Sequence, residues 1–359
     1  MKAEMHVTKL PEIIQSFRFQ TGSCREFGSP FTADLIAAAG DALERGGVLQ
    51  ALLGEWPGNP MTDVLPIRLA GALHAVVLTG RDADLASCYP GDGRAGDGAA
   101  AWRAAEPYIE SHFDWFTDWL KSPPQTNETR RSAALMAGLL TLAADCKLPF
   151  ALLELGASAG LNLNLDRFRY ETASWRWGTG EDVVIDTAWT GQAPPLVPFE
   201  IAARAGCDQN PLDPSSAEDR LRLTAFVWAD QTERLDRLRR ALDLAARAGT
   251  KVEKADAADW IEARMAARPD GRLTVVYHSI FYNYPPQATR DRIDAAIRSA
   301  GAAATETAPL AWLRFEWEGL LGGKPGSLRC VLDLITWPGG ERRLLAEVDP
   351  HGRSVTWLA

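Results

Sequence analysis

The feature that most constrains the fold is a change of pattern at Phe150. Before it, apolar residues recur at helical spacing, whereas after it short apolar runs alternate with helical segments. This alternation is typical of a parallel α/β sheet, because parallel strands are joined by crossover helices. The predicted strands are ALLEL, IAARAGC ending at Asp208, TKVEKAD ending at Asp256, LTVVYHS ending near His278, and PLAWLRFEW.

Helices are predicted between these strands. They are the segment after GASAG, the stretch 216–249, AADWIEARMAAR and PQATRDRIDAAIRSAG. Residues 173–200 interrupt the alternation with short β-like pieces and turn residues, so we expect an inserted hairpin or lid there. The tail contains two or three extended runs joined at Pro-Gly-Gly and Pro-His-Gly turns, which predicts an antiparallel ending.

The first half of the chain has no strong strand pattern. PFTADLIAAAGDALERGG and LPIRLAGALHAVVLTG have helical spacing and stop at glycine, AAWRAAEPYIESHFDWFTDWLK is a tryptophan-rich amphipathic segment, and SAALMAGLLTLAADC is a buried helix. We therefore expect a helical domain over residues 1–145, followed by an α/β domain over residues 146–359.

Composition excludes several classes of partner. The net charge of −9 argues against a nucleic acid bound through its phosphates. No apolar run approaches the roughly 20 residues of a membrane helix, and MKAEMHVTKLPEII has no signal-peptide core, so we expect a cytoplasmic protein.

The five cysteines and five histidines are scattered without metal-ligand spacing, so no metal site is predicted. Thirteen tryptophans favour an aromatic-lined pocket for a small-molecule substrate.

The turn after the first predicted strand has two interpretations. Gly156 and Gly160 flank Ser158, and the strand before them ends in Glu154. GASAG fits the G-x-S-x-G elbow of a serine hydrolase, with Ser158 as nucleophile. Alternatively, the turn is a backbone cradle for a nucleotide-bearing cofactor. The cofactor interpretation is favoured because helices rather than strands precede the turn, and because Glu154 has no role in the hydrolase. A binding module without catalysis is a third reading.

Polar residues close four of the predicted strands. Ligands of parallel α/β sheets bind at the carboxyl ends of strands. Asp208 can accept hydrogen bonds from ribose hydroxyls, Asp256 can read an adenine edge, and His278 can serve as a base or contact the substrate. Each also has an ordinary structural role: Asp208 in a turn, Asp256 as a helix N-cap, and His278 as a satisfied strand-end residue.

Two of these stretches resemble the Rossmann-like S-adenosylmethionine-dependent methyltransferases. ELGASAG is similar to their first motif, an acidic residue followed by G-x-G-x-G, with Ser158 at the middle glycine. GCDQNP resembles their second-strand end, where an acidic residue holds the ribose. The resemblance implies S-adenosylmethionine as cofactor, with Glu154 near its aminoacyl end and Asp208 near its ribose. The cofactor-binding set then comprises Glu154, Gly156, Ser158, Gly160, Asn162, Asp208 and Asp256.

The whole chain also resembles the bacterial domain-of-unknown-function 2332 family. The matching stretches are FRFQTGSC with SPF, RLAGALHAVVL, QTNETRR, LELGASAGLNLNLDRFRY, GCDQNPLD and VVYHSIFYNY. This resemblance implies a methyltransferase-like domain behind a helical one. In QTNETRR, Asn127 and Arg131 are expected either to close over the cofactor or to act as caps and surface charges.

These observations predict methyl transfer to a small-molecule acceptor. The chemistry needs an aligned nucleophile and a base. His278 and Tyr282, at the end of the most apolar strand, are the predicted catalytic residues.

Overall fold

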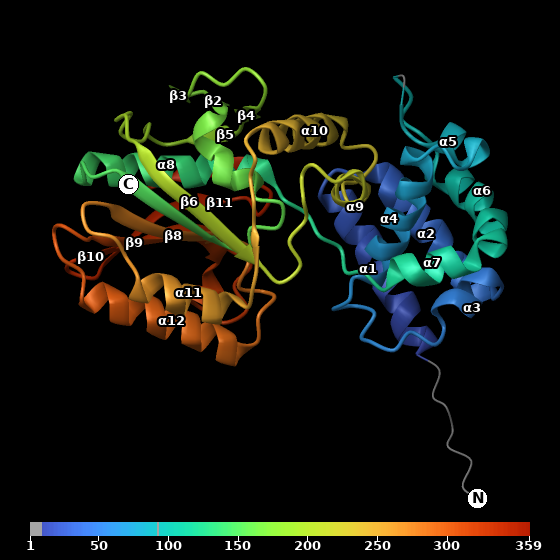
Figure 1. The fold of residues 1–359 in the computed structure, drawn as a ribbon. Coiled ribbons are helices and arrows are strands. Elements are labelled where there is room, and N and C mark those ends of the chain that lie inside the picture. The colour runs from blue at the N-terminus through green and yellow to red at the C-terminus, as the bar shows by residue number, and fades with distance from the viewer. Residues whose placement is uncertain (1–8, 92) are drawn as a thin grey trace, which may run out of the picture. The chain divides into compact units, whose positions relative to one another are not determined.

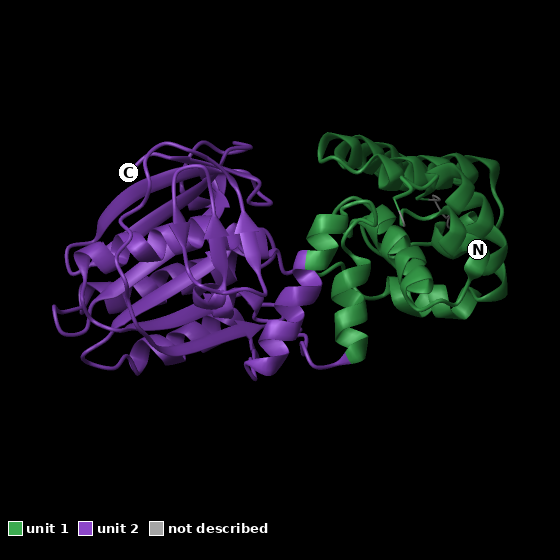
Figure 2. Cartoon of the chain, turned by 90° about the horizontal axis from the view of Figure 1, so that it is seen from above, with its two compact units in different colours: residues 1–126, 217–236 green, residues 127–216, 237–359 purple. Residues whose placement is uncertain are grey.

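The computed structural model (Figure 1) describes residues 9–91 and 93–359, which form two compact units (Figure 2). The helical unit runs to Thr126 and includes Ala217–Asp236, and the sheet unit comprises Asn127–Ser216 with Arg237–Ala359. This division differs from the expected boundary at residue 145 in two places. The helix over 132–145 belongs to the sheet unit, and residues 217–236 belong to the helical unit.

The described part of the helical unit consists of helices and their connections, as its sequence predicts. Its helices are α1 (Leu10–Glu26), α2 (Pro30–Arg45), α3 (Val48–Leu53), α4 (Leu65–Leu78), α5 (Ala83–Cys88), α6 (Gly98–Ser111), α7 (Phe113–Leu120) and α9 (Ala217–Ala225). The late segment is anchored by Asp230, which accepts hydrogen bonds from the Ser29 hydroxyl and, at 3.0 Å, from the Phe31 N–H. Phe226 is buried in the same core.

A sheet of nine strands forms the other unit. Its order is β5-β12-β11-β10-β9-β8-β1-β6-β7. The strands are β1 (Phe150–Leu155), β5 (Ala188–Thr190), β6 (Ile201–Asp208), β7 (Glu253–Lys254), β8 (Leu273–Ser279), β9 (Leu310–Trp317), β10 (Cys330–Trp337), β11 (Glu341–Val348) and β12 (Ser354–Trp357). The strands from β7 to β9 are parallel, whereas β10, β11 and β12 are each antiparallel to the strand before them. The expected antiparallel ending is thus confirmed.

Helices cover both faces of this sheet. α11 (Ala257–Ala266) and α12 (Gln287–Ala302) lie on one face, where Leu153, Leu155 and Val276 pack against their apolar residues. α8 (Ser132–Asp145) lies on the opposite face, against β9 and β10 (Figure 1). Because successive residues of a strand point to opposite faces, Glu154 points away from α11 and α12.

The interruption expected at residues 173–200 contains short strands. β2 (Arg169–Glu171), β3 (Arg176–Trp177) and β4 (Val184–Asp186) form a separate three-stranded sheet, and β5 pairs with β12 at the edge of the large sheet.

The helix expected directly after GASAG is wrong as an α-helix. The segment Leu161–Arg167 is the 3-10 helix η2. Its LNLNL pattern alternates with a period of two, and asparagine is a poor helix former. Asn164 donates to the Gly160 carbonyl oxygen and to the Thr250 hydroxyl, so its side chain serves the turn instead of a regular helix.

Two other predicted elements are shorter than expected. The stretch 216–249 contains two helices, α9 and α10 (Thr232–Arg247), because residues 226–231 are drawn into the core and contacts of the helical unit. TKVEKAD yields only the two exposed residues of β7, since this strand lies at the edge of the sheet. Asp256 therefore follows the strand instead of ending it. None of the described helices is long and apolar enough to span a bilayer.

Leu152 tests how closely the centre of the sheet is packed. Its side chain has no exposed surface, so Leu152→Ala should cost about 2–5 kcal/mol of stability through lost contacts and a cavity. Hydrogen exchange of the β1 and β8 amides would measure this loss. Leu196→Ala, at a 47% exposed position, is the matched control. Equal effects of the two substitutions would contradict close packing at Leu152.

Candidate functional site

The candidate site lies along the edge formed by the carboxyl ends of the parallel strands. From β1 the chain proceeds to β6 and β7 on one side, and then to β8 and β9 on the other. The winding therefore reverses between β1 and β8, and open α/β sheets bind ligands at such a switch point. Glu154, Asp208 and His278 lie near the ends of β1, β6 and β8 on this edge.

The turn after β1 has a left-handed backbone at three positions. The φ angles are +68° at Gly156, +55° at Ser158 and +70° at Gly160. Glycine adopts this conformation freely, whereas serine is strained there. A Cβ at Gly156 would lie 2.4 Å from Phe281 Cδ2, and one at Gly160 would lie 2.7 Å from Thr250 Cγ2. Both glycines are thus required by the backbone and by the packing of this chain's own side chains.

Asp208 joins this turn to the end of β6. Its Oδ2 accepts the Ser158 N–H at 2.9 Å, and its Oδ1 accepts the Asn210 N–H at 2.9 Å. A carboxylate offers about four acceptor positions, so each oxygen retains one for a further donor. Asp208 is half-buried and can therefore combine its turn role with binding of a ligand hydroxyl.

Glu154 lies in a small buried polar group. The Tyr277 hydroxyl lies 3.2 Å from Glu154 Oε2 and 3.3 Å from the Asn162 carbonyl oxygen. Burial raises the pKa of Glu154 to about 8; the Tyr277 hydrogen bond opposes this rise and the charge of Asp208 adds to it. Asn162 is also buried, and its Oδ1 has no hydrogen-bond partner among the described residues. The Tyr277 hydroxyl therefore joins the Glu154 carboxyl to the backbone of Asn162 near the end of β1.

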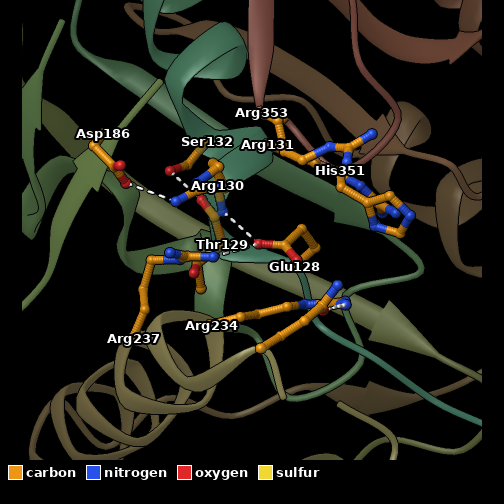
Figure 3. A network of polar contacts seen from close by, with 12 residues as sticks. Glu128, Thr129, Arg130, Arg131, Ser132, Asp186, Arg234, Arg237, His351 and Arg353 are labelled. Carbon is orange, nitrogen blue, oxygen red and sulfur yellow. Dashed lines mark hydrogen bonds and ion pairs between the residues drawn. The ribbon is translucent and has the colours of Figure 1, made fainter. Parts of the chain in front are cut away.

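The QTNETRR segment makes several contacts with the rest of the sheet unit. Asn127 Oδ1 accepts the Leu161 N–H at 3.0 Å, which fixes the start of η2. Glu128 Oε1 accepts the Arg130 N–H at 3.0 Å and lies 3.4 Å from Arg237 Nη2 (Figure 3). The Glu128 side chain thereby caps the short 3-10 helix η1 (Thr129–Arg131) that precedes α8.

The two arginines of this segment extend the connections (Figure 3). Arg131 donates from Nε to the Pro350 carbonyl oxygen at 2.8 Å and from Nη1 to the Ser279 carbonyl oxygen at 3.1 Å. Arg130 forms an ion pair with Asp186 at 2.8 Å. Asn127 and Arg131 thus both make hydrogen bonds to the backbone of the sheet unit.

The predicted catalytic residues lie in the interior. His278 Nδ1 lies 2.7 Å from Glu316 Oε1, and neither side chain has exposed surface. The Tyr282 ring stacks on the imidazole with a centroid distance of 4.5 Å, and its hydroxyl donates to Asp294 at 2.7 Å. Burial, with the charge of Asp294, raises the pKa of Tyr282. These two residues form a packed layer between the end of β8 and α12.

Asp256 lies outside this group of contacts. It is the N-cap of α11, with Oδ1 accepting the N–H groups of Ala258 at 2.9 Å and Asp259 at 3.2 Å. The N-cap role accounts for the presence of an aspartate at position 256.

Glu316 and Tyr277 were not identified from the sequence alone. The available signal was Glu316 itself, a charged residue inside the apolar run AWLRFEW.

Residues 9–91 and 93–359 contain no group of three or more histidine, cysteine, aspartate or glutamate side chains able to hold a metal ion.

Glu154 gives the stability of the sheet unit a defined pH dependence. The folded group titrates near pH 8, whereas an ordinary glutamate titrates near 4.5. Between these values the folded chain binds the extra proton, so stability should fall by about 1.4 kcal/mol per pH unit as pH rises. Urea unfolding at pH 5, 6.5 and 8 should show this slope in the wild type and its loss in Glu154→Gln.

The exposed-residue variant Glu171→Gln is the control and should keep the wild-type slope. Parallel profiles for wild type and Glu154→Gln would mean that Glu154 is ionised in the folded protein.

Comparison with known proteins gives one match. No curated protein and no solved structure matches the chain. One family model covers residues 15–357, from α1 to the end of β12. The chain therefore belongs to the family described as uncharacterized protein conserved in bacteria, DUF2332.

Proposed function

We propose that the sheet unit is a Rossmann-like methyltransferase domain that uses S-adenosylmethionine and acts on a small-molecule acceptor. The observation that carries this proposal is the strand order. The parallel strands lie in the order β7-β6-β1-β8-β9 across the sheet. If these five strands are numbered by their order along the chain, this arrangement is 3-2-1-4-5, which is that of nucleotide-binding doubly wound sheets. Glu154 is the penultimate residue of the first strand of this series, and Asp208 is the last residue of the second.

The residues present fit such a cofactor in two respects. Asp208 has acceptor positions left for ribose hydroxyls. The Asn162 Oδ1, buried and without a partner among the described residues, is an acceptor that an ammonium group would satisfy. The Tyr277 hydroxyl contacts both Glu154 Oε2 and the backbone carbonyl oxygen of Asn162. Phe281 packs against Gly156, so a cofactor touching this glycine requires the phenylalanine to move.

The cofactor would supply an electrophilic methyl group. Asp208 would hold the ribose, and Glu154 with Asn162 would hold the amino group. His278 would accept a proton from the acceptor. Burial at the end of β8 would keep water from the reaction.

S-adenosylhomocysteine binding tests this proposal by calorimetry. Glu154→Gln and Asp208→Asn should each weaken binding by about ten- to a hundredfold, because a hydrogen bond to a charged group contributes about 1.5–3 kcal/mol. Asp208→Ala should be worse than Asp208→Asn. In buffers of different ionisation enthalpy, wild-type binding at pH 7 should release a proton, since Glu154 must ionise beside the ligand's ammonium group.

Asp256→Asn is the matched control, because asparagine still caps α11, and the Asp256 side chain accepts the N–H groups of that helix. Circular dichroism checks the fold of every variant. Absence of heat and of a thermal shift at millimolar ligand would overturn the proposal. Binding without methyl transfer to any acceptor would favour the non-catalytic module.

One observation favours a serine hydrolase as a second candidate. Ser158 has a φ of +55° on a sharp turn after a strand, and hydrolase nucleophiles occupy strained turns of this kind. Against it, the Ser158 side chain is buried. The hydrogen bond from its N–H to Asp208 also explains the strained turn without catalysis.

A fluorophosphonate probe separates the two enzymes. If Ser158 is part of a cofactor turn, wild-type protein should remain unlabelled, and Ser158→Ala should keep its fold and its affinity for S-adenosylhomocysteine. Mass spectrometry of probe-treated protein makes the measurement. Labelling at Ser158 that is lost in Ser158→Ala would make the hydrolase the better assignment.

A further inference from the structure

Glu316 is where the end of β8 and the loop after it converge. Its Oε1 accepts hydrogen bonds from His278 Nδ1 at 2.7 Å, Phe281 N at 2.6 Å and Tyr282 N at 3.1 Å. Its Oε2 has no hydrogen-bond partner among the described residues, and the side chain is fully buried. A single oxygen that receives two backbone N–H groups acts as an acceptor, so the imidazole must donate to it.

We propose that Glu316 is a positioning residue, which holds His278 in the Nδ1–H tautomer and makes Nε2 the proton-accepting nitrogen. This inference rests on the proposed function. His278 Nε2 is buried and has no hydrogen-bond partner in the described part of the chain. Native proteins rarely leave a buried polar atom unsatisfied, and catalytic groups are among the exceptions. The nitrogen left over by the Glu316 contact is thus the one available to a ligand.

The assigned tautomer limits the class of acceptor. Nε2 can take a proton only from a group that carries one, such as a hydroxyl or an amine. The proton leaves the acceptor's O–H or N–H bond and forms a new N–H bond with the Nε2 lone pair. The electrons of the broken bond stay on the acceptor atom, which becomes the nucleophile. The resulting imidazolium lies beside the Glu316 carboxylate, which compensates its charge.

Glu316 Oε1 also accepts hydrogen bonds from the backbone of the loop that covers His278, at Phe281 and Tyr282. The imidazole is enclosed by Tyr282, Phe281 and Trp312, with centroid distances of 4.5, 5.7 and 6.1 Å. Ile280, the residue directly before Phe281, has a φ of +51°, which is strained for a β-branched residue. An acceptor reaches Nε2 only when the loop of Ile280–Tyr284 moves. Glu316 therefore couples the orientation of the base to the position of its cover.

Imidazole ¹⁵N NMR of the ligand-free protein tests this role directly. At pH about 8.5, where an ordinary histidine is neutral, wild-type His278 should show a protonated Nδ1 and an unprotonated Nε2. His278→Gln assigns the signals. Glu316→Gln keeps an oxygen that can accept all three donors, so the tautomer should persist. Glu316→Ala removes it, and the Nε2–H form should appear.

Asp294→Asn is the matched control, because Asp294 accepts the hydrogen bond of the Tyr282 hydroxyl, whereas the imidazole Nδ1 contacts Glu316. This substitution should leave the tautomer unchanged. A wild-type Nε2–H form, an imidazolium protonated on both nitrogens, or a spectrum of folded Glu316→Ala identical to the wild type would overturn the proposal. The wild-type spectrum decides even if Glu316→Ala does not fold.

The experiment separates this inference from the proposed function. The tautomer is measured without ligand, so loss of the Nδ1–H form in Glu316→Ala supports the role of Glu316 whatever S-adenosylhomocysteine does. Ligand binding together with a wild-type Nε2–H tautomer would leave the cofactor proposal intact and remove Glu316 from it.

Discussion

The pairing of buried ionisable groups is the constraint on which the sheet unit depends. Burying a charge is costly unless a partner and hydrogen bonds compensate it. Arg314 meets Asp333 across β9 and β10 at 2.6 and 2.7 Å, and His278 meets Glu316 across β8 and β9. Among the described residues, Glu154 has the Tyr277 hydroxyl as its one side-chain hydrogen-bond partner, and burial raises its pKa to about 8. Neighbouring strands therefore supply partners for these buried ionisable groups. Glu154, at the candidate site, is the group that lacks an oppositely charged partner of this kind in the described part of the chain.

The same contacts make fold and site difficult to separate. Asn127, Arg131 and Asp208 were expected as ligand contacts, and each makes hydrogen bonds to the backbone of the sheet unit. A truncation to alanine at these positions would change a turn as well as a binding group. Substitutions that keep shape and remove charge, such as Asp208→Asn, therefore report on binding more directly.

Elements with their own periodicity were predictable from sequence. β1, β6, β8 and β9, and the antiparallel ending, follow apolar runs bounded by turn residues. The nature of η2, the split between α9 and α10, and the shortness of β7 depend on contacts distant in sequence, such as Asn164 with Thr250 and Phe31 with Asp230. Likewise, the sequence placed His278 at a strand end, but its partner Glu316 is 38 residues away and becomes apparent only through the β8–β9 register.

The alternation of β8 divides the site into two halves. Tyr277 points with Glu154 to one face of the sheet, and the next residue, His278, points to the α11 and α12 face. Under the proposed function, the cofactor contacts of Glu154 and the acceptor contact of His278 thus arise on opposite faces. The two reactants can meet only where the sheet ends, beyond Ser279. This position is occupied by the strained turn at Ile280, whose φ is +51°. Movement of that turn is therefore a requirement of the proposed reaction, and the hydrogen bonds of Glu316 hold both His278 and the loop that would move.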